Sequence, residues 1–207
     1  MHNSSPADSE ETSSPSSSCT LEHNSRETFE YKELDRSADS FRLIQVLPSR
    51  SSDGWLQLTL WHDAVSSASY RCLSYRWGDQ ADHHTVLLNG KLFTVGENLH
   101  CFLEEAYARN QKHSEALDGA LWIDSICINQ ASPRERGHQV QRMGNIYAGA
   151  TGVLVWLGEQ SISDELHDWL HNSVHSHDSS PWFECSEAVH DQWIRLRCNQ
   201  YWHRAWM

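Results

Sequence analysis

The sequence predicts an α/β domain with a mostly parallel central sheet flanked by helices, a β-hairpin and a C-terminal helical part. Two observations lead to this prediction: apolar runs of strand length alternate with segments of helical period, and a strand, helix and strand follow one another over residues 120–158. Such a unit closes almost only as a crossover between parallel strands. The chain of 207 residues is long enough for one domain with a buried core.

The first forty residues differ in composition from the rest. Residues 1–20 contain eight Ser, and residues 1–40 contain nine acidic and three basic residues, so about half of the net charge of −12 lies there. This composition buries too little apolar surface to offset the entropy cost of ordering. We therefore expect a disordered tail over residues 1–40 and a folded domain over residues 41–207.

The next segments predict strands. Apolar alternation indicates a first strand pair at residues 41–48 and 55–60, with Ser-Ser-Asp-Gly as turn material between them, and an aromatic-rich run indicates another strand at residues 70–78. Residues 85–95 predict a hairpin, because Asn89 and Gly90 stand between two apolar arms. Asn-Gly tolerates the positive φ that a type I′ turn needs at both central positions.

A helical pattern begins at residue 98. Leu99, Phe102, Leu103 and Ala106 share one face, which predicts an amphipathic helix. Residues 120–128 form a short apolar run typical of a strand covered on both faces, with Asp124 inside it.

The clearest helix start lies at Ser132. Its side chain can cap the N–H of Glu135, Glu135 can reach back to the Ser132 N–H, and Pro133 fits the first helical position. This helix leads to a strand at residues 153–158, which places the loop after Ile128 at the carboxyl edge of the sheet.

Near the C-terminus, Val189, Trp193 and Leu196 recur at helical spacing. The pattern predicts a helical face that continues towards Trp202. We expect Trp202 to be buried and Trp206 to be more exposed.

Composition excludes several classes of partner and compartment. The acidic chain has no run of Lys and Arg, so no nucleic-acid partner is expected. No apolar run is long enough to span a bilayer, and six Cys without a C-x-x-C pair favour a reducing, cytoplasmic location. The i, i+4 spacing among His167, His171, His175 and His177 can bind zinc, but no Cys or acid completes a known ligand pattern. No metal site and no cofactor are expected.

Three sequence blocks resemble the fungal heterokaryon-incompatibility (HET) domain family: YRCLSYRWGD at residues 70–79, LWIDSICINQ at residues 121–130, and ERGHQVQRMGNIYAGA at residues 135–150. The resemblance implies an intracellular module of self/non-self recognition and programmed cell death signalling in filamentous fungi. It also implies a TIR-like (Toll/interleukin-receptor) fold by analogy, which carries no function by itself. Family members continue beyond the Y-W-x-R-x-W motif near residue 206, so the chain is expected to be truncated at its C-terminal end.

The family motifs contain the candidate site residues, which form either a pocket or a set of structural contacts. In the structural interpretation, Asn129 and Gln130 satisfy loop backbone groups, and Asp124 pairs with Arg136 or Arg142. In the functional interpretation, the helix N-terminus faces an anion and Trp77 stacks on a base or a nicotinamide ring, although no Gly-rich phosphate motif is present. The residues are Ser74, Tyr75, Trp77, Gly78, Trp122, Asp124, Cys127, Asn129, Gln130, Glu135, Arg136, Gln139, Met143 and Tyr147.

The resemblance predicts a signalling module that binds protein partners or self-associates. One alternative is a TIR-like enzyme that cleaves NAD, with Glu135 or Asp124 as the catalytic carboxylate and NAD as substrate only. A second alternative is an inactive truncated paralogue. Cys127 is expected to be a neutral core thiol rather than a nucleophile, because its I-C-I context is apolar.

Overall fold

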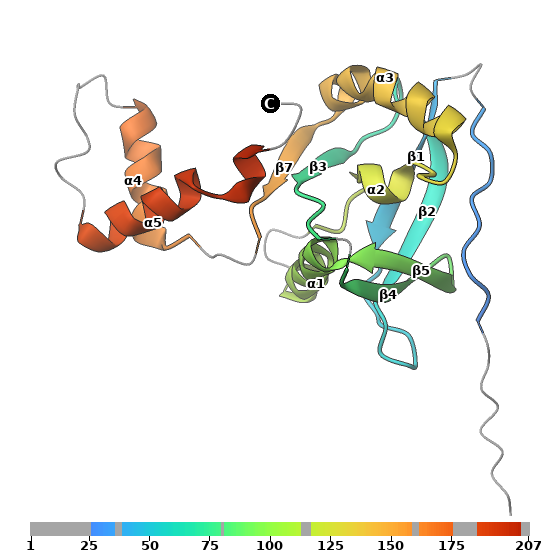
Figure 1. Cartoon of the computed structure of the whole chain (residues 1–207), viewed down its shortest axis with the longest axis horizontal. Helices are drawn as coiled ribbons and strands as arrows, with labels where there is room; N and C mark the ends of the chain where they lie inside the picture. Colours follow the sequence, from blue (N-terminus) through green and yellow to red (C-terminus); the bar gives the residue numbers. More distant parts are fainter. Residues whose placement is uncertain are drawn as a thin grey trace, which may run out of the picture.

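A seven-stranded mixed sheet with helices on both faces forms the body of the protein (Figure 1). The computed structural model describes residues 26–35, 39–79, 81–112, 117–158, 162–175 and 186–203. The α/β class predicted from the sequence is confirmed. Residues 1–25 of the predicted tail lie outside the described residues.

The sheet has the strand order β5-β4-β2-β1-β6-β3-β7. Three neighbouring pairs are antiparallel (β1–β2, β1–β6 and β4–β5), and three are parallel (β2–β4, β3–β6 and β3–β7). The strands are β1 (Ser40–Val46), β2 (Gln57–Ala64), β3 (Arg71–Tyr75), β4 (His83–Leu88), β5 (Lys91–Gly96), β6 (Leu121–Trp122) and β7 (Gly152–Trp156).

The predicted hairpin is formed by β4 and β5. Asn89 and Gly90 both have positive φ, 52° and 78°, as the type I′ turn requires. The Asn89 side chain also accepts a hydrogen bond from the Leu60 N–H and donates one to the Leu60 carbonyl, and these two bonds connect the turn to β2. The hairpin is therefore confirmed.

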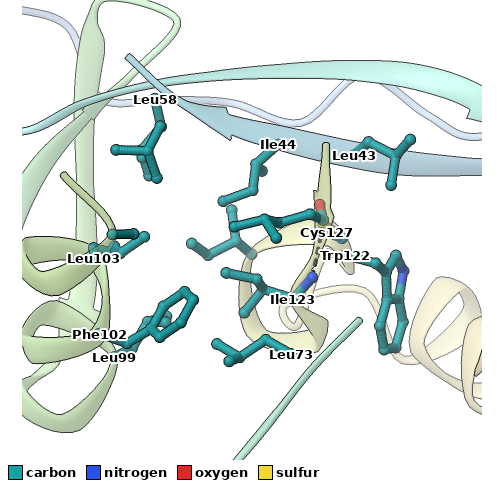
Figure 2. Packing of buried hydrophobic residues seen from close by; sticks show 14 of the residues in the cluster. Leu43, Ile44, Leu58, Leu73, Leu99, Phe102, Leu103, Trp122, Ile123 and Cys127 are labelled. Carbon is teal, nitrogen blue, oxygen red and sulfur yellow. Dashed lines mark hydrogen bonds between the residues drawn. The ribbon is translucent and has the colours of Figure 1, made fainter. Parts of the chain in front are cut away.

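Two helices cover opposite faces of the sheet. On one face, helix α1 (Glu97–Lys112) packs Leu99, Phe102 and Leu103 against Ile44 and its neighbours (Figure 2). On the other face, helix α3 (Pro133–Gly149) meets Trp122, whose ring lies edge-to-face against Tyr147 with centroids 5.6 Å apart. Because both faces are covered, strand β1 is buried along most of its length, including Leu43 and Ile44.

The strand predicted at residues 120–128 is much shorter in the structure. Strand β6 ends at Trp122, and helix α2 (Asp124–Cys127) follows directly. Asp124 therefore begins a helical turn instead of lying within a strand. Its Oδ1 accepts from the Ser125 N–H at 2.8 Å, a local bond that competes with a strand conformation.

Residues 26–35 pack against the domain, which corrects the expectation of a disordered tail up to residue 40. Thr28 forms a parallel bridge with Leu92 of β5, and Phe29 and Tyr31 pack edge-to-face with Phe93. Leu34 is buried. These few apolar residues bury enough surface to order the segment despite its polar composition.

The C-terminal part is helical, as predicted. It consists of α4 (Asp164–His175), α5 (Glu187–Arg197) and a 3₁₀ turn, η2 (Gln200–His203), and it stands beyond β7 (Figure 1). Tyr201 is buried, and its hydroxyl lies 2.7 Å from the Ser74 hydroxyl of β3. Trp202 is 45% exposed, so the expectation that it is buried is wrong, and Trp206 lies outside the described residues.

Candidate functional site

Several of the candidate residues lie where three parallel strands end. Strands β6, β3 and β7 lie side by side and point the same way, so the loops that follow them meet at one edge of the sheet. Carboxyl edges of parallel strands are the usual place for ligand sites in α/β folds. The predicted position of the loop after Ile128 is confirmed.

Asp124 is held at the first position of α2 by a side chain from another loop. The indole Nε1 of Trp77 lies 3.1 Å from each carboxylate oxygen of Asp124. The amide of Gln130 donates to the Asp124 carbonyl at 2.9 Å. Asp124 is 6% exposed, so its carboxylate orients Trp77 rather than facing open solvent. Arg142, one of its predicted partners, pairs with Asp39 instead.

Glu135 is engaged in a buried ion pair with Arg42 of β1. The two guanidinium nitrogens donate to the two carboxylate oxygens at 2.5 and 3.1 Å. The Asn129 N–H donates to the same carboxylate at 2.8 Å. Burial raises the pKa of Glu135, but the hydrogen bonds from Arg42 and Asn129 and the charge of Arg42 outweigh it and hold the pKa below its usual value.

The predicted capping box at Ser132 is therefore half correct. The Ser132 hydroxyl accepts from the Glu135 N–H at 3.3 Å, as expected. The Glu135 carboxylate does not complete the box, because it binds Arg42 and Asn129, and the Ser132 N–H donates to the Asn129 carbonyl.

Sequence reasoning missed Arg42 as part of this cluster. Its side chain is fully buried and also donates to the carbonyls of Cys127 (3.0 Å) and Lys32 (2.6 Å) and to His62 Nε2 (3.2 Å). The Tyr31 ring lies 4.9 Å from the guanidinium carbon. The available signal was a charged residue beside the apolar residues of a predicted buried strand, a position where a partner must exist.

The remaining residues of α3 serve mainly to join the helix to the sheet. Gln139 is buried and donates to the Ser40 carbonyl at 3.3 Å, and the Tyr147 hydroxyl donates to the Leu73 carbonyl at 3.3 Å. Met143 is partly buried against the core, whereas Arg136 is exposed. These contacts fit the structural interpretation of the motif.

The motif after β3 shapes the edge of the sheet. The Tyr75 hydroxyl donates to Ser125 at 2.6 Å, and Gly78 adopts a φ of +78°. A side chain at Gly78 would place its Cβ 3.7 Å from that of Asn98, whose amide donates to the Arg76 carbonyl at 2.6 Å. The positive φ explains why this position needs glycine.

Cys127 is a core thiol. It is 1% exposed, and burial raises its pKa to about 12, with a smaller opposing effect from the Ile123 N–H. A neutral thiol of this kind is a poor nucleophile.

Two hollows flank the loop after β3. One, of about 660 Å³, lies between this loop, the end of β7 and the C-terminal turn, and its lining includes Arg76, Asp79, Glu97, Trp156 and Arg195. The other, of about 340 Å³, lies on the side of β5 and α2, and its lining includes Trp77, Asn129 and Gln130. Of the predicted site residues, Tyr75, Trp77, Asn129 and Gln130 line the smaller hollow and Gly78 lines the larger one. Neither hollow is lined by Glu135, Gln139, Met143 or Tyr147.

In the part of the chain that the structure describes, no helix combines the length and apolar character needed to cross a bilayer.

Comparison with known proteins identifies the family. Residues 70–207 match the family model described as heterokaryon incompatibility protein (HET). The chain is 31% identical over 134 residues to heterokaryon incompatibility protein 6, OR allele, of Neurospora crassa, a match that covers 60% of this chain and 20% of that protein. The matched region thus spans about a fifth of the relative's length, and no solved structure matches the chain. The family model covers most of the chain, from the start of β3 to its last residue, and the chain therefore belongs to the heterokaryon incompatibility (HET) family.

Proposed function

We propose that this protein is a signalling module of fungal heterokaryon incompatibility, which promotes cell death in the cytoplasm by binding protein partners or by self-association. The observation that carries the proposal is the HET family match over residues 70–207, together with a relative whose name states a role in heterokaryon incompatibility.

The geometry of the two candidate carboxylates supports a binding module over the NAD-cleaving alternative. Glu135 is bound by Arg42 and Asn129, and Asp124 is bound by Trp77. A catalytic carboxylate must reach its substrate within hydrogen-bond distance. Both candidates here instead bind groups of the protein that hold loops and strands together.

Inducible expression in a filamentous fungal host tests the signalling proposal. The parent chain is expected to arrest growth. Leu103→Asp places a charge at a fully buried core position and is expected to abolish the effect. Glu104→Gln, at the adjacent, partly exposed position of α1, is the matched control and is expected to retain it.

Normal growth with abundant, soluble parent protein would contradict the proposal and favour an inactive copy. Incubation of the purified protein with NAD, followed by chromatography for released nicotinamide, tests the enzymatic alternative separately. Turnover that is lost in Asp124→Asn would replace the binding module with an enzyme.

A further inference from the structure

The smaller of the two hollows has the dimensions of a small-molecule site. Its volume of about 340 Å³ falls at the lower end of the range typical of ligand pockets, about 300–1,000 Å³. It lies at the carboxyl edge of β3 and β6, and residues 26–35 help to close it through Tyr31.

Aromatic rings form much of its wall. Tyr31, Tyr75, Trp77 and Phe93 all line it. The polar atoms of three of these rings are already bonded: the Tyr31 hydroxyl donates to the Ile126 carbonyl at 2.8 Å, Tyr75 donates to Ser125, and the Trp77 N–H donates to Asp124. The rings are therefore fixed in orientation before any ligand arrives, which lowers the entropy cost of binding.

Trp77 is the exposed member of this wall. Its side chain is 38% exposed, whereas the neighbouring Tyr75 is 3% exposed. A large ring that is anchored by its N–H and still open to a cavity offers a surface on which a flat ring can stack.

The lining disfavours a charged ligand. None of the described residues that line the hollow is Lys, Arg, Asp or Glu. Arg42 already occupies a position over the Tyr31 ring, 4.9 Å from the centroid. A charged group entering here would lose hydration without gaining an ionic partner, so a neutral ring fits best.

Two neighbouring amides supply a polar edge. Asn129 uses its carbonyl oxygen to accept from the Ala131 N–H, and Gln130 uses its amide nitrogen to donate to the Asp124 carbonyl. Among the described residues, no hydrogen bond uses the Asn129 amide nitrogen or the Gln130 carbonyl oxygen, and both residues are partly exposed at the hollow. One donor and one acceptor therefore remain for a ligand.

We propose that this hollow binds a neutral heteroaromatic ring that carries an acceptor beside a donor, as a nucleobase or a nicotinamide carboxamide does. The ring stacks on Trp77, and its polar edge bonds to Asn129 and Gln130. Sugar or phosphate groups attached to the ring extend outside the hollow, where the lining provides no cationic partner for them.

Isothermal titration of the full chain with adenosine tests the proposal. Trp77→Ala is expected to weaken binding by roughly 5- to 150-fold, the range for loss of one base-stacking platform. Asn129→Asp keeps an oxygen that accepts from Ala131 and replaces the free amide donor with a charged acceptor, so it is expected to keep the loop contact and to weaken binding at least roughly tenfold. Trp202→Ala removes a Trp that is 45% exposed outside the hollow and is expected to bind like the parent.

Two further ligands sharpen the test. Titration with NAD shows whether the ring comes from a free nucleoside or from a dinucleotide. If NAD and adenosine bind with equal affinity, the hollow recognises the ring alone. If NAD binds more tightly than adenosine and Trp77→Ala abolishes NAD binding, the ligand is the dinucleotide. Choline probes an aromatic cage for cations. Choline binding without adenosine binding, no binding of either adenosine or NAD, or equal affinity of parent and Asn129→Asp would each overturn the proposal.

Discussion

Arg42 and Glu135, which are 93 residues apart in the sequence, form a buried ion pair with two hydrogen bonds, at 2.5 and 3.1 Å. The pair joins β1, the central strand of the sheet, to the first turn of α3. It also fixes the loop after α2, because Arg42 donates to the Cys127 carbonyl and Glu135 accepts from the Asn129 N–H. This ion pair thus links β1 to two of the three family motifs, at residues 121–130 and 135–150.

Breaking this pair is expected to cost substantial stability. Glu135→Gln leaves the Arg42 charge buried without its counter-ion, and loss of one partner of a buried pair costs about 3–5 kcal/mol. Urea denaturation measures the change. Glu104→Gln, which breaks the exposed pair with Arg50, is the control and is expected to cost less than about 1 kcal/mol. Equal costs for the two variants would show that the buried pair has no special role.

The same carboxylate predicts an acid-sensitive contribution to stability. The pKa of Glu135 in the folded protein is below its usual value of 4.5. A carboxyl with a lowered folded pKa stabilises the fold above the unfolded pKa and loses this effect as the pH falls through the folded pKa. The stability difference between the parent and Glu135→Gln should therefore shrink when the pH is lowered from about 6 to about 3. A difference that stays constant over this range would exclude a lowered pKa.

The cysteines are expected to differ sharply in reactivity. Burial raises the pKa of both Cys72 and Cys127 to about 12, whereas Cys198 is exposed. Iodoacetamide at neutral pH should modify Cys198 in the native protein and leave Cys72 and Cys127 unmodified, because the thiolate is the reactive form. Peptide mapping by mass spectrometry reads out each site, and labelling in urea provides the control. Rapid native labelling of Cys127 would contradict its assignment to the core.

Glycine is expected to be required at position 90 because of its backbone conformation, and not because a side chain would lack space there. Its φ is +78°, and nothing lies within 4 Å of a Cβ placed there. Gly90→Ala should lower the unfolding free energy by about 1–2 kcal/mol, because an L-residue is disfavoured in the left-handed region. Gly119→Ala is the matched control, since that glycine has equal space and no positive φ. A neutral Gly90→Ala would show that the turn relaxes to another type.

The C-terminal turn is expected to be tied to β3 through one hydroxyl pair. Tyr201 and Ser74 are buried, with their oxygens 2.7 Å apart. A double-mutant cycle with Tyr201→Phe and Ser74→Ala should give a coupling energy of about 0.5–1.5 kcal/mol, since the Phe ring keeps the apolar packing of Tyr201. Thermal or urea unfolding measures it. Additive effects of the two substitutions would indicate that the contact is not formed in solution.

The candidate site was only partly predictable from the motifs. They placed Trp77, Asn129 and Gln130 at the carboxyl edge of the sheet, and these residues line a hollow there. They also assigned Glu135 to a local capping role, whereas its carboxylate binds Arg42 from β1. Such a pairing depends on which strand lies beside the helix, and periodicity carries no information about that neighbour.

The sequence alone determined the features whose causes are local. The Asn89-Gly90 turn, the apolar face of α1 and the Ser132 cap of α3 each depend on residues a few positions apart, so their physical basis is complete within a short segment. Only the tertiary structure decided that residues 26–35 pack against the domain, that β6 is short and that Trp202 is exposed. These outcomes depend on surfaces supplied by distant parts of the chain, because burial and buried charge pairing are set by the neighbours that folding brings together.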